Sequence, residues 1–369
     1  MDIQYVPAMR REDRHQVAAG RGAVSNPGGR FEGTRLEADD DGWGCLEELP
    51  RRPETVLLAD RPRRAITRNA SPDVPFDQSV NPYQGCEHGC IYCFARPSHA
   101  YWNLGAGLDF ETRIFHKPGL APLLARELSA PGYECKPINL GANTDPYQPA
   151  EREHRTTRAL LEVLLAHRHP VTIVTKGTLV LRDLDLLAPL AERRLCSVAV
   201  SLTTLDDDLK RVLEPRAAAP RARLRVISEL VAAGVPVTVL LAPIIPALND
   251  HEMERLVEVA VQAGASHAAF MPVRLPHELG TLFEQWLREH YPERAERVLN
   301  RVREMRGGRL NDPRFGHRMR GEGPYAALLA ARFAAACRRH GLGDRRAPAL
   351  DCSQFVRDPG APTQGDLFG

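Results

Sequence analysis

The sequence predicts an α/β protein whose strands are mostly parallel. Three observations support this prediction: short apolar segments recur through the middle of the chain, a helical pattern separates each from the next, and a repeat of roughly 25 to 40 residues leaves room for a crossover helix. Such alternation is typical of a doubly wound open sheet and also of a barrel. Hydrophobic periodicity alone does not separate these two architectures.

The expected strands are short apolar runs. The first of the series covers Ser79–Gln84. Further strands are expected at Pro137–Gly141, Val171–Thr175, Cys196–Leu202, Val237–Ala242 and Ala268–Pro272. The segments between them carry the helical patterns.

Three of the expected helices have clear sequence signals. Glu151–His167 carries apolar residues at helical spacing, and Arg221–Ala233 and His251–Ala263 each end at a glycine. Glycine commonly ends a helix because it adopts the left-handed conformation there without strain. Strand and helix therefore alternate along the middle of the chain.

The chain divides into four parts. Residues 1–70 are expected to form an irregular leader, partly disordered, because Gly, Pro, Arg and acidic residues interrupt every apolar period there. Residues 71–277 form the α/β core, 278–356 a helical extension, and 357–369 a flexible tail rich in Pro and Gly. The segment from Tyr291 to Arg346 has 14 Arg against 6 acidic residues. This excess predicts either a solvated surface or a phosphate-binding surface.

Composition excludes several classes of protein. With 369 residues, 43% of them hydrophobic, the chain can bury a substantial core and is not wholly disordered. Its 49 Lys and Arg nearly cancel its 47 Asp and Glu, which excludes a function that depends on uniform charge. No apolar run approaches the ~20 residues of a membrane span, and the first residues lack a secretion signal, so we expect a cytoplasmic protein without membrane contact.

Three of the eight cysteines lie in one short motif. Cys86, Cys90 and Cys93 form a C-x3-C-x2-C array directly after the first expected strand. A [4Fe–4S] cluster held only by protein takes four cysteines, so three thiolates without a fourth nearby leave one iron open for chemistry. The alternative is a zinc site completed by His88 or His99. Zinc sites usually combine two separated ligand pairs, and the sequence has no second pair.

This motif resembles that of the radical S-adenosylmethionine (SAM) superfamily. The strings SVNPYQGCEHGCIYCFARPSHAYW, GANTDPYQPAEREHRTTRALLE and PVTVLLAPIIPALND resemble the branch related to spore photoproduct lyase, a DNA repair enzyme, and within it the PA0069-family radical SAM proteins. The resemblance extends from about Gly20 to Asp351. It implies a partial parallel (β/α)6 barrel, TIM-like, over residues 71–277, with the active site at the carboxyl ends of the strands.

The resemblance also implies two cofactors, a [4Fe–4S] cluster and SAM. In this superfamily the open iron chelates the amino and carboxylate groups of SAM, and an electron from the cluster cleaves the sulfonium to give methionine and a 5′-deoxyadenosyl radical. The implied metal ligands and catalytic residues are Cys86, Cys90 and Cys93. Tyr92, directly before the last cysteine, is expected to pack on the SAM adenine.

Further SAM-binding residues follow from the same resemblance. Asn143, Thr144 and Asp145, after the second strand, occupy the position that binds the SAM amino group. Lys176 is expected to pair with the SAM carboxylate, and Ser201 to reach the ribose or carboxylate. Local backbone capping would explain Thr144 and Ser201 as well. A charged set fits either the branch's pattern or a structural ion-pair network: Arg182, Asp183, Glu214 and Arg223.

The sequence departs from spore photoproduct lyase at one place. That enzyme uses a cysteine at the end of the second strand as a hydrogen-atom donor, whereas Ala142 and Asn143 stand here. Tyr147 or Cys135 could donate instead if folding brings either close. The departure argues against the same thymine-dimer reversal but leaves radical initiation intact.

The sequence therefore predicts a radical SAM enzyme that acts on a nucleic acid, repairing or modifying a base. The alternatives are a small-molecule or protein substrate and, from another class, a zinc-stabilised binding module. Expected partners are an electron donor such as flavodoxin or ferredoxin, and DNA or RNA. The tail sequence QGDLF resembles the peptide by which bacterial proteins dock on the sliding clamp, through Gln364, Leu367 and Phe368.

Overall fold

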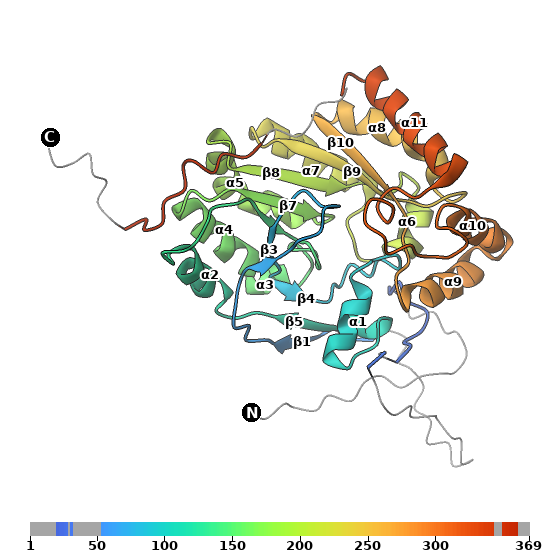
Figure 1. Cartoon of the computed structure of the whole chain (residues 1–369), viewed down its shortest axis with the longest axis horizontal. Coiled ribbons are helices and arrows are strands. Elements are labelled where there is room, and N and C mark those ends of the chain that lie inside the picture. Colours follow the sequence, from blue (N-terminus) through green and yellow to red (C-terminus); the bar gives the residue numbers. More distant parts are fainter. Residues whose placement is uncertain (1–19, 29, 32–52, 343–348, 361–369) are drawn as a thin grey trace, which may run out of the picture.

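The computed structural model describes residues 20–28, 30–31, 53–342 and 349–360 (Figure 1). A seven-stranded sheet with the order β10-β9-β8-β7-β6-β3-β2 forms its centre. All neighbours from β3 to β10 are parallel, and β2 pairs antiparallel with β3. The strands are β2 (Thr67–Arg68), β3 (Gln78–Val80), β6 (Ile138–Leu140), β7 (Val171–Thr175), β8 (Cys196–Ser201), β9 (Val237–Ile244) and β10 (His267–Pro272).

A second, three-stranded sheet lies beside the first strand of the barrel (Figure 1). Its order is β1-β5-β4, with β1 and β5 parallel and β4 antiparallel to β5. Its strands are β1 (Val56–Ala59), β4 (Tyr83–Gln84) and β5 (Arg113–His116). This small sheet positions the segment that follows β4, which carries the three clustered cysteines.

Helices connect the parallel strands and cover the outside of the main sheet (Figure 1). Those between β4 and β10 are η1 (Arg96–Trp102), α1 (Leu108–Thr112), α2 (Leu120–Leu128), α3 (Glu151–His154), α4 (Thr156–Ala166), η2 (Thr178–Asp183), α5 (Leu184–Glu192), α6 (Asp207–Leu213), α7 (Pro220–Ala232), η3 (Asp250–Glu252) and α8 (Met253–Gln262). The extension adds α9 (Leu279–His290), α10 (Pro292–Glu304) and α11 (Gly323–Arg339).

The core lies between the sheet and these helices. Burial alternates along β7, β8 and β9, so that every second side chain is fully packed and the next is only partly covered. Ile173, Val198 and Val239 from the strands pack with Leu160 and Leu230 from the helices in one buried cluster. The other set of side chains faces the inside of a partial barrel, as expected for strands that are covered on one side and line a cavity on the other.

The expected elements agree with the structure in kind and differ at several boundaries. The strand expected at Ser79–Gln84 is two strands, β3 and β4, which belong to different sheets. Pro82 lies between them, and its missing N–H cannot join a ladder. The helix expected at Glu151–His167 is interrupted at Arg155, whose φ of 48° is left-handed.

The range expected as irregular leader contains regular structure. Strands β1 and β2 lie before residue 71 and pair with β5 and β3. Each is at most four residues long, and the register partner of Val56 is Arg113, so no local period announces them. Residues 20–28, which the structure also describes, lie against the cysteine segment, as shown below.

The end of the described chain returns to the amino ends of the strands. After α11, residues 349–360 run past the turns that precede β7 and β8, at the left of Figure 1. Asp351 N donates to Arg194 O at 3.0 Å and Val356 N to His167 O at 2.9 Å. We call residues 349–360 the C-terminal strap. The sliding-clamp residues Gln364, Leu367 and Phe368 lie outside the described residues. None of the described helices combines the length and apolar character that a membrane crossing requires.

Candidate functional site

The three clustered cysteines lie in a loop between β4 and η1, next to the carboxyl ends of the strands. Cys86 and Cys90 are buried and Cys93 is half-buried, and all three are free thiols. The loop bends at Gly85 and Gly89, which have φ values of 78° and 67°. A Cβ atom at Gly89 would lie 2.7 Å from a Glu111 carboxylate oxygen, so the loop requires glycine there for space as well as for its backbone conformation.

The thiols themselves are poorly solvated. Burial raises the pKa of Cys86, and it raises the pKa of Cys90 to about 12 despite the opposing charge of Lys176. Buried thiols that are hard to ionise become stable thiolates only when a metal centre binds them. Three free cysteines within one loop of eight residues, 86–93, are the donor set of a [4Fe–4S] cluster with one open iron, so these residues fit such a cluster.

Arg96 holds this loop from beneath. Its fully buried guanidinium donates to Cys90 O at 2.8 Å, Gly89 O at 3.1 Å and the Glu111 carboxylate at 2.5 Å. It also donates to two carbonyls of the next turn, Ala106 O at 3.1 Å and Gly107 O at 2.9 Å. Because the guanidinium is a rigid fork of five donors, these bonds fix the loop carbonyls in one arrangement.

The described leader residues complete this support. The Glu111 carboxylate accepts from Gly22 N at 2.9 Å and from Ala23 N at 2.8 Å, while Arg21 donates to Glu111 O at 2.8 Å. A Cβ atom at Gly22 would lie 1.8 Å from Gly89 O, so only glycine fits against the loop. The leader therefore packs on the cysteine loop.

Two residues after β6 attach the start of the loop to the sheet. Gln148 donates from Nε2 to Gly85 O at 3.2 Å and accepts from Glu87 N at 3.0 Å, on either side of Cys86. Thr144 donates from Oγ1 to Gly85 O at 2.7 Å. The hydroxyl of Thr144 thus serves the backbone, the alternative that the sequence left open.

The predicted residues Asn143 and Asp145 lie at the carboxyl end of β6. Both Asp145 carboxylate oxygens accept hydrogen bonds, from Thr175 Oγ1 and from Lys176 N, each at 2.7 Å. His88 Nδ1 lies 3.2 Å from Asp145 Oδ2. Burial raises the pKa of Asp145, but His88 and these hydrogen bonds outweigh it and lower the pKa to about 2.

Unlike the carboxylate oxygens of Asp145, the side-chain oxygen of Asn143 is left without a hydrogen bond in the described part of the chain. Its Nδ2 donates to Ser98 Oγ at 3.2 Å and its backbone N to Asn81 Oδ1 at 2.8 Å. Its side-chain oxygen has no hydrogen-bond partner among the described residues. An amide oxygen held in this way can accept from an ammonium group.

Tyr92 and Lys176 face each other beside the loop. Lys176 Nζ lies 5.7 Å from the centroid of the Tyr92 ring. Within the described part of the chain, the ammonium of Lys176 forms no hydrogen bond or ion pair. Burial lowers the pKa of Lys176, but the neighbouring Cys90 and Glu214 outweigh this effect and raise it. Lys176 is therefore a charged ammonium available to an incoming carboxylate.

A buried ion pair lies beneath Tyr92. Glu214 accepts from Arg223, from the Tyr92 hydroxyl and, at 2.7 Å, from Thr203 Oγ1. Burial raises the pKa of Glu214, but Arg223 and Lys176 outweigh it and lower the pKa to about 2. Arg223 also donates to Ser201 O at 3.1 Å. The ion pair thus joins Tyr92 to the carboxyl end of β8, where Ser201 is buried.

The zinc alternative finds no support in the geometry. Among the described residues, no three His, Cys, Asp or Glu side chains converge closely enough to hold one metal ion. His99 is engaged elsewhere, with Nε2 3.0 Å from Arg113 O and its ring 5.1 Å from that of Phe110. Three sulfurs that bind three different irons do not need to converge on one point.

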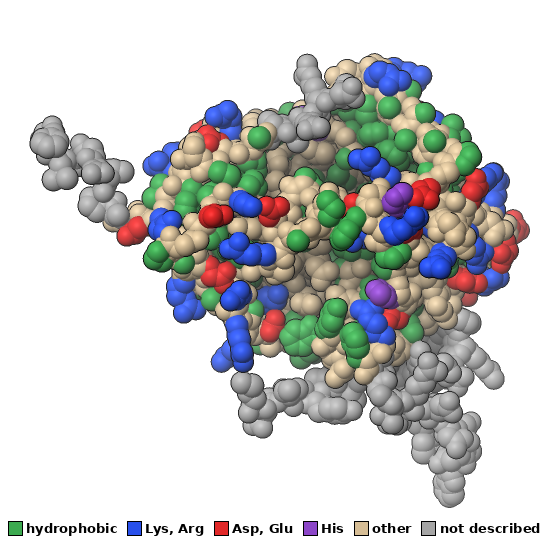
Figure 2. Space-filling model, viewed as in Figure 1, with side chains coloured by type: hydrophobic (Ala, Val, Ile, Leu, Met, Phe, Trp, Pro, Cys, Tyr) green, Lys and Arg blue, Asp and Glu red, His purple; other side chains and the backbone are tan. Residues whose placement is uncertain are grey.

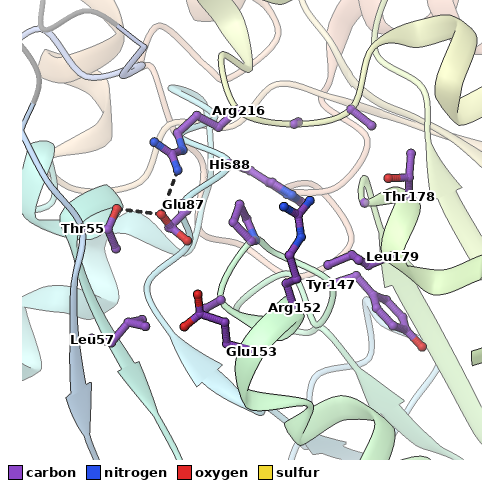
Figure 3. A pocket seen from close by; sticks show the side chains of 15 residues that line it. Thr55, Leu57, Glu87, His88, Tyr147, Arg152, Glu153, Thr178, Leu179 and Arg216 are labelled. Carbon is purple, nitrogen blue, oxygen red and sulfur yellow. Dashed lines mark hydrogen bonds and ion pairs between the residues drawn. The ribbon is translucent and has the colours of Figure 1, made fainter. Parts of the chain in front are cut away.

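A cavity of about 560 Å³ opens beside the cysteine loop (Figure 3). Glu87 and His88 of the loop line it, together with Arg152, Thr178 and Arg216. Glu87 accepts from Arg216 at 3.1 Å and from Thr55 Oγ1 at 2.6 Å. The residues predicted to bind SAM are not among those that line this cavity, although Gly177, next to Lys176, and Tyr147 are.

One of the two suggested hydrogen-atom donors is far from the site. Cys135 precedes β6, at the amino end of the strand, and its side chain lies beside Cys352 of the C-terminal strap. The suggestion that Cys135 donates is therefore wrong. Tyr147 follows the carboxyl end of β6, and its backbone N donates to Asp145 Oδ1 at 2.9 Å, so it stays close to the site.

The chain matches known proteins over this same region. The family model described as the radical SAM superfamily matches residues 80–260. The uncharacterized protein Rv2578c of Mycobacterium tuberculosis is 38% identical over 234 residues, which are 63% of this chain and 68% of that protein. The uncharacterized protein MJ0683 of Methanocaldococcus jannaschii is 28% identical over 60% of this chain and 80% of its own length.

Solved structures of spore photoproduct lyase share the fold. A mutant with dinucleoside spore photoproduct aligns with a TM-score of 0.56 and 15% identity, over 77% of this chain and 79% of that chain. A second mutant aligns with a TM-score of 0.55 and 14% identity, over 78% and 80%. Other structures of that enzyme align over 66% of their length, with a TM-score of 0.49.

These comparisons cover the cysteine loop and the parallel strands around it. At such low identity, the structural likeness shows the fold alone, an α/β partial barrel with a mostly parallel sheet. The family match begins at the end of β3 and continues past β9. The chain accordingly belongs to the radical SAM superfamily, which implies a [4Fe–4S] cluster and SAM as its cofactors.

Proposed function

We propose that this protein is a radical SAM enzyme that acts on a base of a nucleic acid, in repair or modification. The observation that carries the SAM-dependent part is the placement of the loop of Cys86, Cys90 and Cys93 beside Lys176. The ammonium of Lys176 has no hydrogen-bond or ion-pair partner among the described residues. The nucleic-acid part is supported by the fold, which resembles that of an enzyme solved with a dinucleoside photoproduct. We place the reaction in the cytoplasm.

Each residue has a proposed task. Cys86, Cys90 and Cys93 hold the [4Fe–4S] cluster, which, when bound, supplies the electron that cleaves SAM. The Lys176 ammonium pairs with the SAM carboxylate, and Asn143 Oδ1 accepts from its amino group.

The other predicted residues act through position and shape. Tyr92 packs on the adenine with its hydroxyl fixed by Glu214, and Ser201 offers a polar group at the end of β8. Thr144 and Asp145 are positioning residues, since their side chains bond to Gly85 O and to the turn after β7. Together, Tyr92, Ser201, Thr144 and Asp145 exclude water from the region between SAM and the cluster and fix the orientation of SAM.

The basic extension contributes less to this proposal than its composition suggests. Several of its arginines form ion pairs with carboxylates of the same chain, such as Arg301 with Glu304 at 2.6 Å and Arg332 with Glu254 at 2.7 Å. Figure 2 shows acidic and basic side chains interspersed over the face in view. The helices of the extension therefore favour a solvated surface, and charge for nucleic acid has to be sought nearer the site.

Anaerobic incubation tests the proposed function. The reconstituted protein is given SAM and dithionite, with and without single-stranded DNA, duplex DNA or RNA, and mass spectrometry follows 5′-deoxyadenosine and the polymer. We expect 5′-deoxyadenosine in every sample, at least about 10-fold more with the preferred polymer, and a mass change in that polymer. Equal 5′-deoxyadenosine in all samples, with unaltered polymers, would favour a small-molecule or protein substrate.

Two partners complete the proposal. The electron comes from a small reductase partner such as flavodoxin or ferredoxin, because radical SAM enzymes need a reductant. The tail residues Gln364, Leu367 and Phe368 dock on the DNA polymerase sliding clamp. A peptide of residues 357–369 is expected to bind the clamp in fluorescence polarisation, since a Leu-Phe pair fills an apolar pocket. A peptide with L367A and F368A is the control, and equal binding by both peptides contradicts the docking.

A further inference from the structure

Two exposed aromatic rings lie near the last cysteine, and each carries an arginine. Phe94 directly follows Cys93 and is 42% exposed, and the guanidinium carbon of Arg274 lies 4.5 Å from its ring centroid. Phe315 is 58% exposed, and the guanidinium of Arg318 lies 4.7 Å from its centroid. We call these four residues the aromatic rim. An arginine covers one face of each ring, and the exposure of the rings leaves other surface open.

The rim combines three segments that are far apart in the sequence. Phe94 belongs to the cysteine loop, Arg274 follows the carboxyl end of β10, and Phe315 and Arg318 lie in the connection between α10 and α11. Arg274 is close enough to Cys93 and to Arg318 for both to affect its charge. The fold thus brings the rim to the same edge of the barrel as the cysteines.

Arg274 differs from the two arginines beside it. Arg318 donates to Asp73 at 2.5 Å, and Arg306 donates to four carbonyl oxygens, those of Pro272, Val273, His317 and Arg318. Arg274 makes no hydrogen bond or ion pair with any described residue, and its Nε is buried without an acceptor. Of these three guanidiniums only that of Arg318 is paired with a carboxylate of the described residues, that of Asp73.

A purely structural role explains only part of this arrangement. Stacking of Arg274 on Phe94 is a common contact that stabilises a surface. It does not explain why Phe315, the most exposed ring of the rim, is held over solvent, or why a partly buried guanidinium lacks a counter-ion. A guanidinium without a hydrogen-bonded carboxylate attracts an anion, and its fork of donors matches the oxygens of a phosphate.

A second group of exposed rings with an arginine includes a residue close in sequence to Phe94 of the rim. Tyr101 is 72% exposed and lies 5.4 Å from Phe31, centroid to centroid, and Arg30 lies over both rings at 5.2 Å and 5.8 Å. Arg30 also pairs with Glu278 at 3.4 Å, four positions after Arg274. Exposed rings that alternate with arginines are the means by which proteins hold unpaired nucleotides, whose bases stack while their phosphates bind the cations.

We propose that the aromatic rim binds unpaired nucleotides of a single-stranded or locally opened nucleic acid, with a phosphate on Arg274 and a base stacked on Phe315. The proposal rests on the proposed nucleic-acid function and gives it a location and a strand state. Bases inside a duplex are already stacked on their neighbours, so they cannot reach these rings. A duplex would contact only the arginines of the rim, through its phosphates.

Fluorescence anisotropy of the reconstituted protein tests this proposal without turnover. The probes are a fluorescein-labelled single-stranded DNA of about 12 nucleotides, the RNA of the same sequence, and the matched DNA duplex. We expect one of the single strands to bind at least about 10-fold more tightly than the duplex. We expect R274Q and F315A each to weaken that binding by about 10-fold.

The salt dependence separates the two tasks. R274Q is expected to lower the slope of log Kd against log salt by about 0.7, the loss of one phosphate contact, whereas F315A leaves the slope unchanged. F315Y keeps a ring and is expected to retain binding. R288Q is the matched control, because Arg288 is exposed and bonded to Glu284 and Glu296 at 2.8 Å and 2.7 Å. It should bind as the parent does.

The outcomes distinguish a failure of the rim proposal from a failure of the proposed nucleic-acid function. Wild-type protein that binds none of the probes contradicts the nucleic-acid function itself. Binding of a single strand that F315A and R274Q leave unchanged overturns the rim while the function stands. Because Phe315 is largely exposed, F315A does not depend on core packing, so its result is decisive even if R274Q fails to fold. Equal affinity for duplex and single strand overturns the proposed strand state.

Discussion

Replacing Cys86, Cys90 or Cys93 by alanine, one at a time, is expected to reduce release of 5′-deoxyadenosine from SAM by more than about 100-fold, since changes in the outer shell of a metal site alone cost about 10- to 100-fold. Each alanine removes one of only three sulfur ligands from the loop. The fold should persist, because the buried cluster of the sheet and its helices does not include these residues. Liquid chromatography of anaerobic reactions measures the nucleoside, and circular dichroism checks the fold.

A cysteine outside the loop provides the control. Cys337 is buried in α11, and C337A removes a thiol without removing a proposed ligand. This variant is expected to retain iron, brown colour and nucleoside release. Electron paramagnetic resonance adds a second reading, since SAM should change the signal of the reduced parent protein and not that of C90A. Parent-like nucleoside release from any of the three loop variants would refute the assignment of the ligands.

The second large effect is expected from Arg96, which touches no predicted ligand side chain. R96M keeps the length of the side chain but removes five hydrogen bonds and leaves the Glu111 carboxylate buried without its ion-pair partner. Breaking a buried pair in this way costs about 3–5 kcal/mol. We therefore expect a lower free energy of unfolding in a urea titration and, because Cys90 O and Gly89 O lose their donor, a reduced iron content per chain.

The control for Arg96 should change charge without changing the loop. R288M removes an exposed guanidinium from α9 and is expected to shift stability by less than about 0.5 kcal/mol. R96K separates charge from shape: it keeps the cation beside Glu111 but cannot bond to several carbonyls at once, so its iron content should lie between those of R96M and the parent protein. Full iron content and unaltered stability in R96M would show that the cysteine loop keeps its conformation without Arg96.

The sequence predicts the alternation of strands and helices well, and for a physical reason. Val171–Thr175 is observed with the expected bounds because a short apolar strand between helical patterns is a local signal. The three-stranded sheet escapes such reasoning, since β1 and β5 are paired across more than fifty positions of chain. Pro82 divides the first expected strand, and only the tertiary structure shows that its two halves join different sheets.

The site is divided in the same way. The proposed roles of the cysteines, Lys176 and Tyr92 come from spacing and resemblance, because a motif is visible in one dimension. Arg96 and Gln148, which hold the loop, are missed because a buried arginine and an exposed one look alike in sequence. The position of Arg96, three residues after Cys93, is the one local hint. Asp145 is found at the expected place, but its oxygens are already bonded to the neighbouring strand end.

The C-terminal strap has a consequence for how many macromolecules this protein can engage at once. Phe355 of the strap packs against Tyr133, which precedes β6, and against His167 and His169, which precede β7. Arg357 donates to Tyr133 O at 3.4 Å. These contacts hold the last described residues at the amino ends of the strands, opposite the end that carries the cysteines. If the tail binds the sliding clamp and the site binds a nucleic acid, as proposed above, the two partners would approach opposite ends of the barrel, and one could stay bound while the other is exchanged.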